Sequence, residues 1–106
     1  MKPKVASSAV HVRALERVRS IVLDVLDTED VRVYLFGSCA TGSPRATSDI
    51  DVAIEPLHGS GLPSLAELRE RLEDSDVPYD VDVVDLSTVS PEFAQRVRLE
   101  GIVWKG

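Results

Sequence analysis

The sequence predicts an α/β (α+β) fold, a small mixed sheet flanked by helices. Apolar residues recur at helical spacing near the N-terminus and again in two later segments. Short runs rich in β-branched and aromatic residues stand between these segments. The expected order is helix, strand, strand, helix, strand, helix and a last short strand, which is an order that packs helices against a sheet.

The individual elements follow from these periods and from helix-capping signals. The first helix is expected over about residues 8–26. A capping box, in which Glu67 follows Ser64 by three residues, predicts that Ser64 caps the second helix. Ser90 followed by Pro91 predicts the start of the last helix. The expected strands span 31–37, 49–55, 79–86 and 102–104, and the two later helices span 65–73 and 91 to near 101.

Composition and charge narrow the classes of function. The chain has 106 residues, which favours one domain over 1–106, and its net charge of -6 argues against a nucleic-acid partner, because such partners select basic faces. Cys39 is the only cysteine, so neither an internal disulfide nor a cysteine-based zinc site can form. No apolar run approaches the ~20 residues that cross a membrane. A cytoplasmic protein without membrane contact is therefore expected.

Two acids, Asp49 and Asp51, stand in the second expected strand. Side chains in a strand alternate between faces, so the two carboxylates share one face, about 7 Å apart. The apolar residues of the same strand take the opposite, core face: Ile50, Val52 and Ile54. Such carboxylates repel each other, and a divalent cation offsets the repulsion. Mg²⁺ is held by one or two carboxylates plus substrate phosphates, and a pair of ions about 3.5–4 Å apart can clamp a phosphoryl displacement.

A glycine-serine turn, Gly37-Ser38, ends the first expected strand shortly before these acids. Gly37 has no Cβ, so the backbone can approach a ligand closely. If a helix starts at Ser38, its free N–H groups and its hydroxyl suit a phosphate, although simple helix capping is the alternative role for this serine. The turn and the acids together predict a triphosphate held beside metal ions.

A third carboxylate would complete a two-metal site, and the third expected strand offers Asp80, Asp82 and Asp85. Asp80 and Asp82 share a face, and Asp85 takes the other. Asp82 stands mid-strand between valines, where an unpaired acid would be costly, so we predict that it is the third ligand and the base on the incoming hydroxyl. The alternative for Asp82 is an edge-strand charge that limits aggregation.

The block FGS…SDIDVAI, followed by VDVVDL and SPEF, resembles the minimal nucleotidyltransferases (MNT) of the DNA polymerase beta superfamily. The resemblance covers roughly residues 10–104 and implies a polymerase-beta-like nucleotidyltransferase core. The site residues that it implies are Gly37 and Ser38 for the triphosphate of ATP, with help from Arg45, and Asp49, Asp51 and Asp82 for two Mg²⁺ ions.

The resemblance further implies transfer of AMP from ATP to a hydroxyl. A chain that is nearly all core would take its acceptor from a partner. This fits MNT antitoxins that adenylylate a HEPN-domain ribonuclease toxin, typically on a tyrosine, within a hetero-oligomer. Cys39 and Thr41 stand where many relatives carry arginines. This departure leaves open a binding antitoxin without turnover. A second alternative is a subunit of a small-molecule (aminoglycoside-type) adenylyltransferase.

Overall fold

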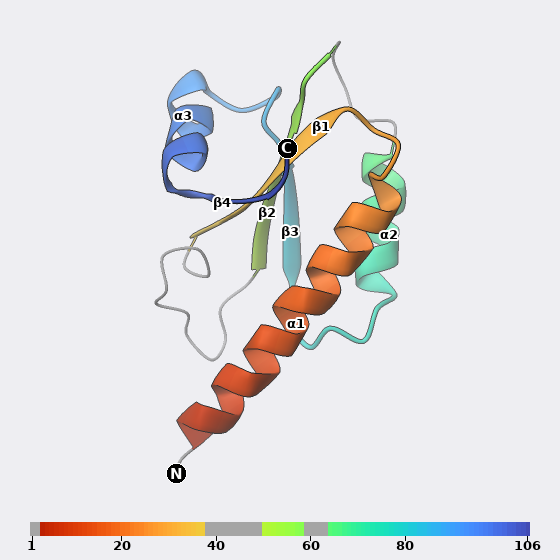
Figure 1. The fold of residues 1–106 in the computed structure, drawn as a ribbon, viewed down its shortest axis with the longest axis vertical. Coiled ribbons are helices and arrows are strands. Elements are labelled where there is room, and N and C mark those ends of the chain that lie inside the picture. The colour runs from red at the N-terminus through yellow and green to blue at the C-terminus, as the bar shows by residue number, and fades with distance from the viewer. Residues whose placement is uncertain (1–2, 38–49, 59–63) are drawn as a thin grey trace.

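The computed structural model shows a four-stranded mixed sheet with helices on both faces (Figure 1). It describes residues 3–37, 50–58 and 64–106. In chain order the elements are α1 Pro3–Val25, β1 Val31–Phe36, β2 Ile50–Pro56, α2 Leu65–Glu73, β3 Val81–Asp85, α3 Pro91–Glu100 and β4 Ile102–Lys105. The predicted fold class and the predicted order of elements are confirmed.

The strand order in the sheet is β3-β2-β1-β4, so β3 and β4 are its two edges. Strand β1 pairs antiparallel with both β2 and β4, whereas β2 and β3 are parallel. A parallel pair needs a long crossover, and here α2 lies within that connection. The topology therefore places β2, which carries Asp51, next to β3, which carries Asp82, the predicted third metal ligand.

Two apolar clusters hold the helices on opposite faces of the sheet. Ile50, Val52 and Ile54 are fully buried in the larger cluster, which includes residues of α1 and α2, so their predicted core face is confirmed. On the other face, Tyr34 and Ala53 belong to a smaller cluster that includes residues of α3. Because β2 alternates between these faces, the face that carries Asp51 is the one that α3 covers in part.

One predicted helix start and one predicted helix cap differ from the structure, whereas α2 spans the predicted residues 65–73. Helix α1 begins at Pro3, before the predicted residue 8, and its backbone continues the helical path without a break. The Ser64 side chain makes no capping hydrogen bond, so the capping-box prediction is wrong. Its backbone has φ -85° and ψ 0° instead of the extended conformation that aims an N-cap hydroxyl at the first turn. The predicted cap at Ser90 is confirmed, because its Oγ accepts a hydrogen bond from the Phe93 N–H at 3.2 Å.

An ion pair fastens α3 to the central strand β2. The Arg98 Nη2 and Glu55 Oε2 atoms are 2.6 Å apart, and the Tyr34 hydroxyl donates to Glu55 Oε1 at 3.1 Å. The hydrogen bond from Arg98 holds the pKa of the Glu55 carboxyl below its usual range, against the opposing effect of burial. The Arg98 guanidinium is itself 44% exposed, so solvent screens part of this interaction.

We predict that Arg98→Ala lowers stability near neutral pH by about 0.5–1 kcal/mol. A lowered pKa in the folded state means that Glu55 contributes stability above its unfolded value of 4.5, and that this contribution is lost as pH falls through the lower folded pKa. Chemical denaturation at about pH 7 and about pH 3 should therefore show a smaller loss at acid pH. Arg96→Ala is the control, because its pair with Glu100 is exposed and 4.0 Å long; an equal loss in both variants would contradict the prediction.

Candidate functional site

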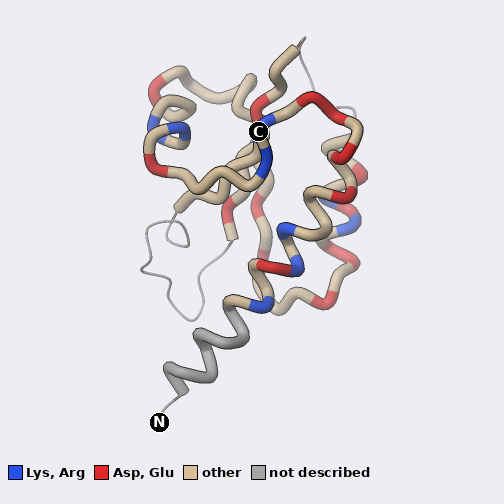
Figure 2. Tube along the Cα trace, viewed as in Figure 1, with Lys and Arg blue, Asp and Glu red and all other residues tan. Residues whose placement is uncertain are grey.

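Asp51 and Asp82 lie directly opposite each other on the neighbouring parallel strands β2 and β3. Residues in register on adjacent strands share a face, and the strands lie only about 4.8 Å apart. Figure 2 shows that both strands carry acidic positions. The structure thus brings together two carboxylates that the sequence analysis assigned to one metal site.

The surroundings of Asp82 differ from those predicted. Its side chain is exposed, and its strand, β3, is an edge of the sheet. The choice of Asp82 as a metal ligand was based on the cost of burying an unpaired acid. That argument is wrong, because Asp82 is not buried. The prediction that Asp82 faces the same site as Asp51 nevertheless agrees with the register.

Gly37 directly follows β1 and lies beside Asp51. Its neighbour Phe36 is the cross-strand partner of Asp51. Gly37 itself has φ +79°, a backbone conformation that residues other than glycine rarely adopt. A Cβ added to Gly37 would clash with Asp51 Oδ2. A glycine is therefore required at position 37, because the backbone there lies close to the Asp51 carboxylate.

The remaining predicted site residues lie outside the described residues: Ser38, Arg45 and Asp49, together with Cys39 and Thr41. The other two acids of the third strand are described. Asp80 is exposed just before β3. Asp85 is 7% exposed, and its Oδ1 accepts hydrogen bonds from the Ser87 N–H at 2.8 Å and the Ser87 hydroxyl at 2.6 Å. Asp85 is thus engaged in the turn after β3, on the face opposite to Asp82.

The chemistry of the Asp51–Asp82 pair fits a hard divalent cation. Carboxylate oxygens are the ligands that Mg²⁺ takes, and the site offers one carboxylate from each of two neighbouring strands. Within the part of the chain that the structure describes, no three His, Cys, Asp or Glu side chains gather as a metal site. The pair therefore fits the part of a metal site that β2 and β3 would supply.

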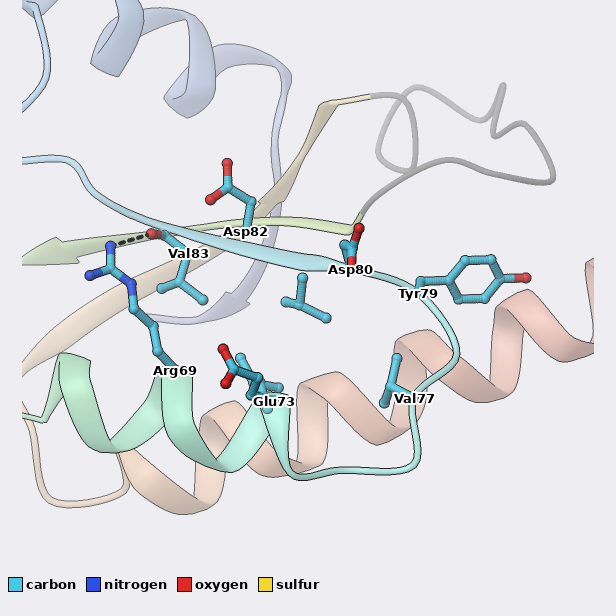
Figure 3. Close-up of a pocket in the computed structure, with 9 residues that line it drawn as sticks. Arg69, Glu73, Val77, Tyr79, Asp80, Asp82 and Val83 are labelled. Atoms are coloured by element: carbon cyan, nitrogen blue, oxygen red, sulfur yellow. Dashed lines mark hydrogen bonds between the residues drawn. The ribbon is translucent and has the colours of Figure 1, made fainter.

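A groove runs along the free edge of β3 and was not foreseen from the sequence (Figure 3). Its volume is ≈ 560 Å³, and its lining includes Asp80 just before β3, Asp82 on β3, and Arg69 and Glu73 on α2. Arg69 Nη2 donates a hydrogen bond to the Val83 carbonyl at 2.9 Å. Nothing in the local sequence signals this contact, because it joins two elements through the tertiary fold.

A smaller hollow of ≈ 280 Å³ lies between the end of β1 and α3. Phe36 and Phe93 form its aromatic part, with ring centroids 5.6 Å apart in an edge-to-face arrangement. Gly37 also lines this hollow.

No helix in the described ranges combines the length and apolar character of a membrane span.

Comparison with known proteins gives a family match over most of the chain. Residues 24–104 match the family described as "Polymerase beta, Nucleotidyltransferase". A curated relative, the protein adenylyltransferase MntA of Shewanella oneidensis, is 39% identical over 71 residues, which are 65% of this chain and 49% of the relative. The chain thus spans about half the length of that relative.

Two solved structures share the fold. One is a toxin-antitoxin with AMP-PNP: its TM-score is 0.65 at 30% identity, and the match covers 83% of this chain and 73% of that chain. The other is a tri-AMPylated Shewanella oneidensis HEPN toxin in complex with an MNT antitoxin: its TM-score is 0.59 at 26% identity, and the match covers 86% of this chain and 71% of that one.

We predict that Gly37→Ala destabilises the fold by about 1–2 kcal/mol, because the added methyl group meets the Asp51 carboxylate and the positive φ is strained. Urea denaturation measures the change. Gly106→Ala is the matched control: its φ is also positive, but its Cβ would meet only the flexible Arg32 side chain. If both variants unfold at the wild-type urea concentration, the close approach at Gly37 is not a constraint.

Proposed function

The chain belongs to the polymerase beta nucleotidyltransferase family, and we propose that it transfers AMP from ATP to a hydroxyl of a HEPN-domain toxin, a tyrosine in the first instance, and so acts as its antitoxin. The observation that carries this proposal is the register that places Asp51 opposite Asp82. Gly37, which directly follows β1, lies beside Asp51. The family has a nucleotide as its substrate, and a similar solved structure was obtained with the ATP analogue AMP-PNP.

Each residue of the site has a role in the proposed reaction. Gly37 and Ser38 hold the triphosphate through backbone N–H groups, and Arg45 adds a positive charge. Asp51 and Asp82 hold Mg²⁺ together with Asp49. Bound there, Mg²⁺ supplies positive charge against the phosphate oxygens and the carboxylates.

The proposed transfer is a displacement at the α-phosphorus of ATP. The acceptor oxygen forms a bond to that phosphorus, the bond from the phosphorus to the β-phosphate oxygen breaks, and pyrophosphate leaves. The hydroxyl proton passes to the Asp82 carboxylate, whose exposed position on the edge strand lets an acceptor reach it. The product is an AMP ester of the acceptor.

The partner and the setting belong to the same proposal. The MntA relative is named a protein adenylyltransferase, and the HEPN toxin in the similar complex carries AMP groups. We therefore assign this chain a toxin of the HEPN class as its acceptor, in a hetero-oligomer. Residues 1–106 act as a single nucleotidyltransferase domain in the cytoplasm, where the lone Cys39 stays reduced.

We predict that Asp82→Asn lowers AMP transfer by about 100-fold or more, because the variant loses both a metal ligand and a proton acceptor. The melting temperature should stay the same or rise, since the repulsion between Asp82 and Asp51 is removed. Asp80→Asn is the matched control on the same strand face and should retain transfer. Transfer is measured with α-labelled ATP and the co-purified partner; wild-type transfer by Asp82→Asn would remove this residue from the site.

We also predict that EDTA abolishes transfer and that added Mg²⁺ restores it. The position of the label separates the three functional hypotheses in the same assay. Label on the partner protein supports the antitoxin enzyme. Tight binding of an unlabelled partner supports a binding antitoxin, and label that appears only on an added aminoglycoside supports a small-molecule transferase. Transfer that is indifferent to EDTA contradicts the metal assignment.

A further inference from the structure

We propose that the free edge of β3 docks the acceptor: an extended, basic segment of the partner protein pairs with β3 as an added strand and so brings its hydroxyl beside Asp82. The inference rests on the proposed function for the reaction, but the docking surface is argued from β3 and α2 alone. Strand addition to an exposed sheet edge is an established mode of peptide recognition.

The backbone of β3 leaves the necessary groups unpaired. The Ile50 N–H donates to the Asp80 carbonyl at 2.9 Å, and the Leu86 N–H donates to the Ile54 carbonyl at 2.9 Å. Residues of a strand alternate between its two neighbours, so even-numbered residues of β3 bond to β2, and Val81 and Val83 turn their N–H and C=O groups to the free edge. Within the described residues, only one of these four groups has a partner, the Val83 carbonyl.

Arg69 sets where the added strand can pair. Its Nη2 atom occupies the Val83 carbonyl at 2.9 Å, which leaves both groups of Val81 and the N–H of Val83. The available groups therefore flank Asp82 on both sides. A strand that uses them has one residue directly opposite Asp82, so the edge specifies the register of the acceptor.

The alternation of side chains then separates two functions. The side chain opposite Asp82 lies on the face of Asp82 and Asp51, with about 4.8 Å between the strands, so its hydroxyl approaches the carboxylate pair. The residues on either side of it point to the opposite face, into the groove between β3 and α2. Figure 3 shows Arg69 and Glu73 reaching from α2 toward this side of β3.

The charge of the groove selects a basic occupant. Glu73, Asp80 and Asp82 line it and form no ion pair within the described part of the chain, while Arg69, the basic residue of the lining, is bonded to Val83. Lys or Arg beside the acceptor residue points to the α2 side of β3, where it would pair with Glu73, and the net negative lining of the groove attracts a basic segment. A second copy of this chain would instead set the same acids against each other, so the geometry favours a basic partner over self-association.

The test uses a synthetic peptide as the probe, Gly-Val-Lys-Tyr-Lys-Val-Gly, with a fluorophore at one end. We expect the full chain to bind it at least about tenfold more tightly than the peptide with Glu in place of Lys. N-methylation of the two lysine amides removes the donors that would reach Val81, and it should weaken binding to a similar extent. Fluorescence anisotropy measures all three affinities. If the three peptides bind equally, or if the lysine peptide does not bind, the docking proposal is overturned.

Protein variants test the same surface from the other side. Glu73→Lys should weaken binding of the lysine peptide about tenfold, while Glu70→Lys, the same charge change elsewhere on α2, should leave it unchanged. Val81→Pro removes an outward N–H, which an edge strand tolerates, together with a side chain that packs at the margin of the core, and it should also weaken binding. Equal affinities in Glu73→Lys and Glu70→Lys would overturn the proposal.

Failure of the docking inference and failure of the proposed function give different results. A chain that labels its partner from ATP equally well as wild type and as Glu73→Lys refutes the docking surface and leaves the proposed function in place. A chain that binds the peptide in the predicted order but transfers no label to the partner refutes the proposed function and supports the docking surface.

Discussion

The register between β2 and β3 is the constraint on which the site depends, because it holds two like charges opposite each other. Bonds at both ends of the parallel pair, from Ile50 to Asp80 and from Leu86 to Ile54, fix that register. A slip by one residue would move Asp51 to the face of the buried core and expose Val52. The core therefore opposes a slip of register, and the two acidic positions stay opposite each other.

Three residues of β2 lie on the sheet face that α3 covers in part, and they differ in their surroundings. Ala53 is fully buried with the α3 cluster, and Glu55 is neutralised by Arg98, which lowers the pKa of its carboxyl. Asp51, at the other end, lies beside Gly37 and opposite Asp82. Helix α3 thus covers one half of this face and supplies the cation that neutralises Glu55. On the other half Asp82 is exposed and Asp51 is partly exposed, as the proposed nucleotide chemistry requires.

Much of this arrangement could be predicted from local patterns, and two of the failures come from tertiary structure that local patterns do not contain. Period and capping signals gave the order of the elements, the core face of β2 and the Ser90 cap, because these depend on near neighbours in the chain. The expected burial of Asp82 was wrong because its strand is an edge, which strand order decides. The groove wall at Arg69 was missed for the same reason. Ser64 has a capping sequence without the capping backbone. The roles predicted for Ser38, Arg45 and Asp49 stay predictions.

The acids on β3 reconcile two roles that the sequence left as alternatives. An open edge strand invites pairing with another copy, and charged residues on it oppose that pairing. Asp80 and Asp82 supply this protection, and Glu73 extends it across the groove. The same charges do not oppose a basic strand, so protection against self-association and selection of a basic acceptor follow from one electrostatic pattern. An acid that protects the edge and lies opposite Asp51 does not need burial, so the exposure of Asp82 is compatible with its proposed role as a metal ligand.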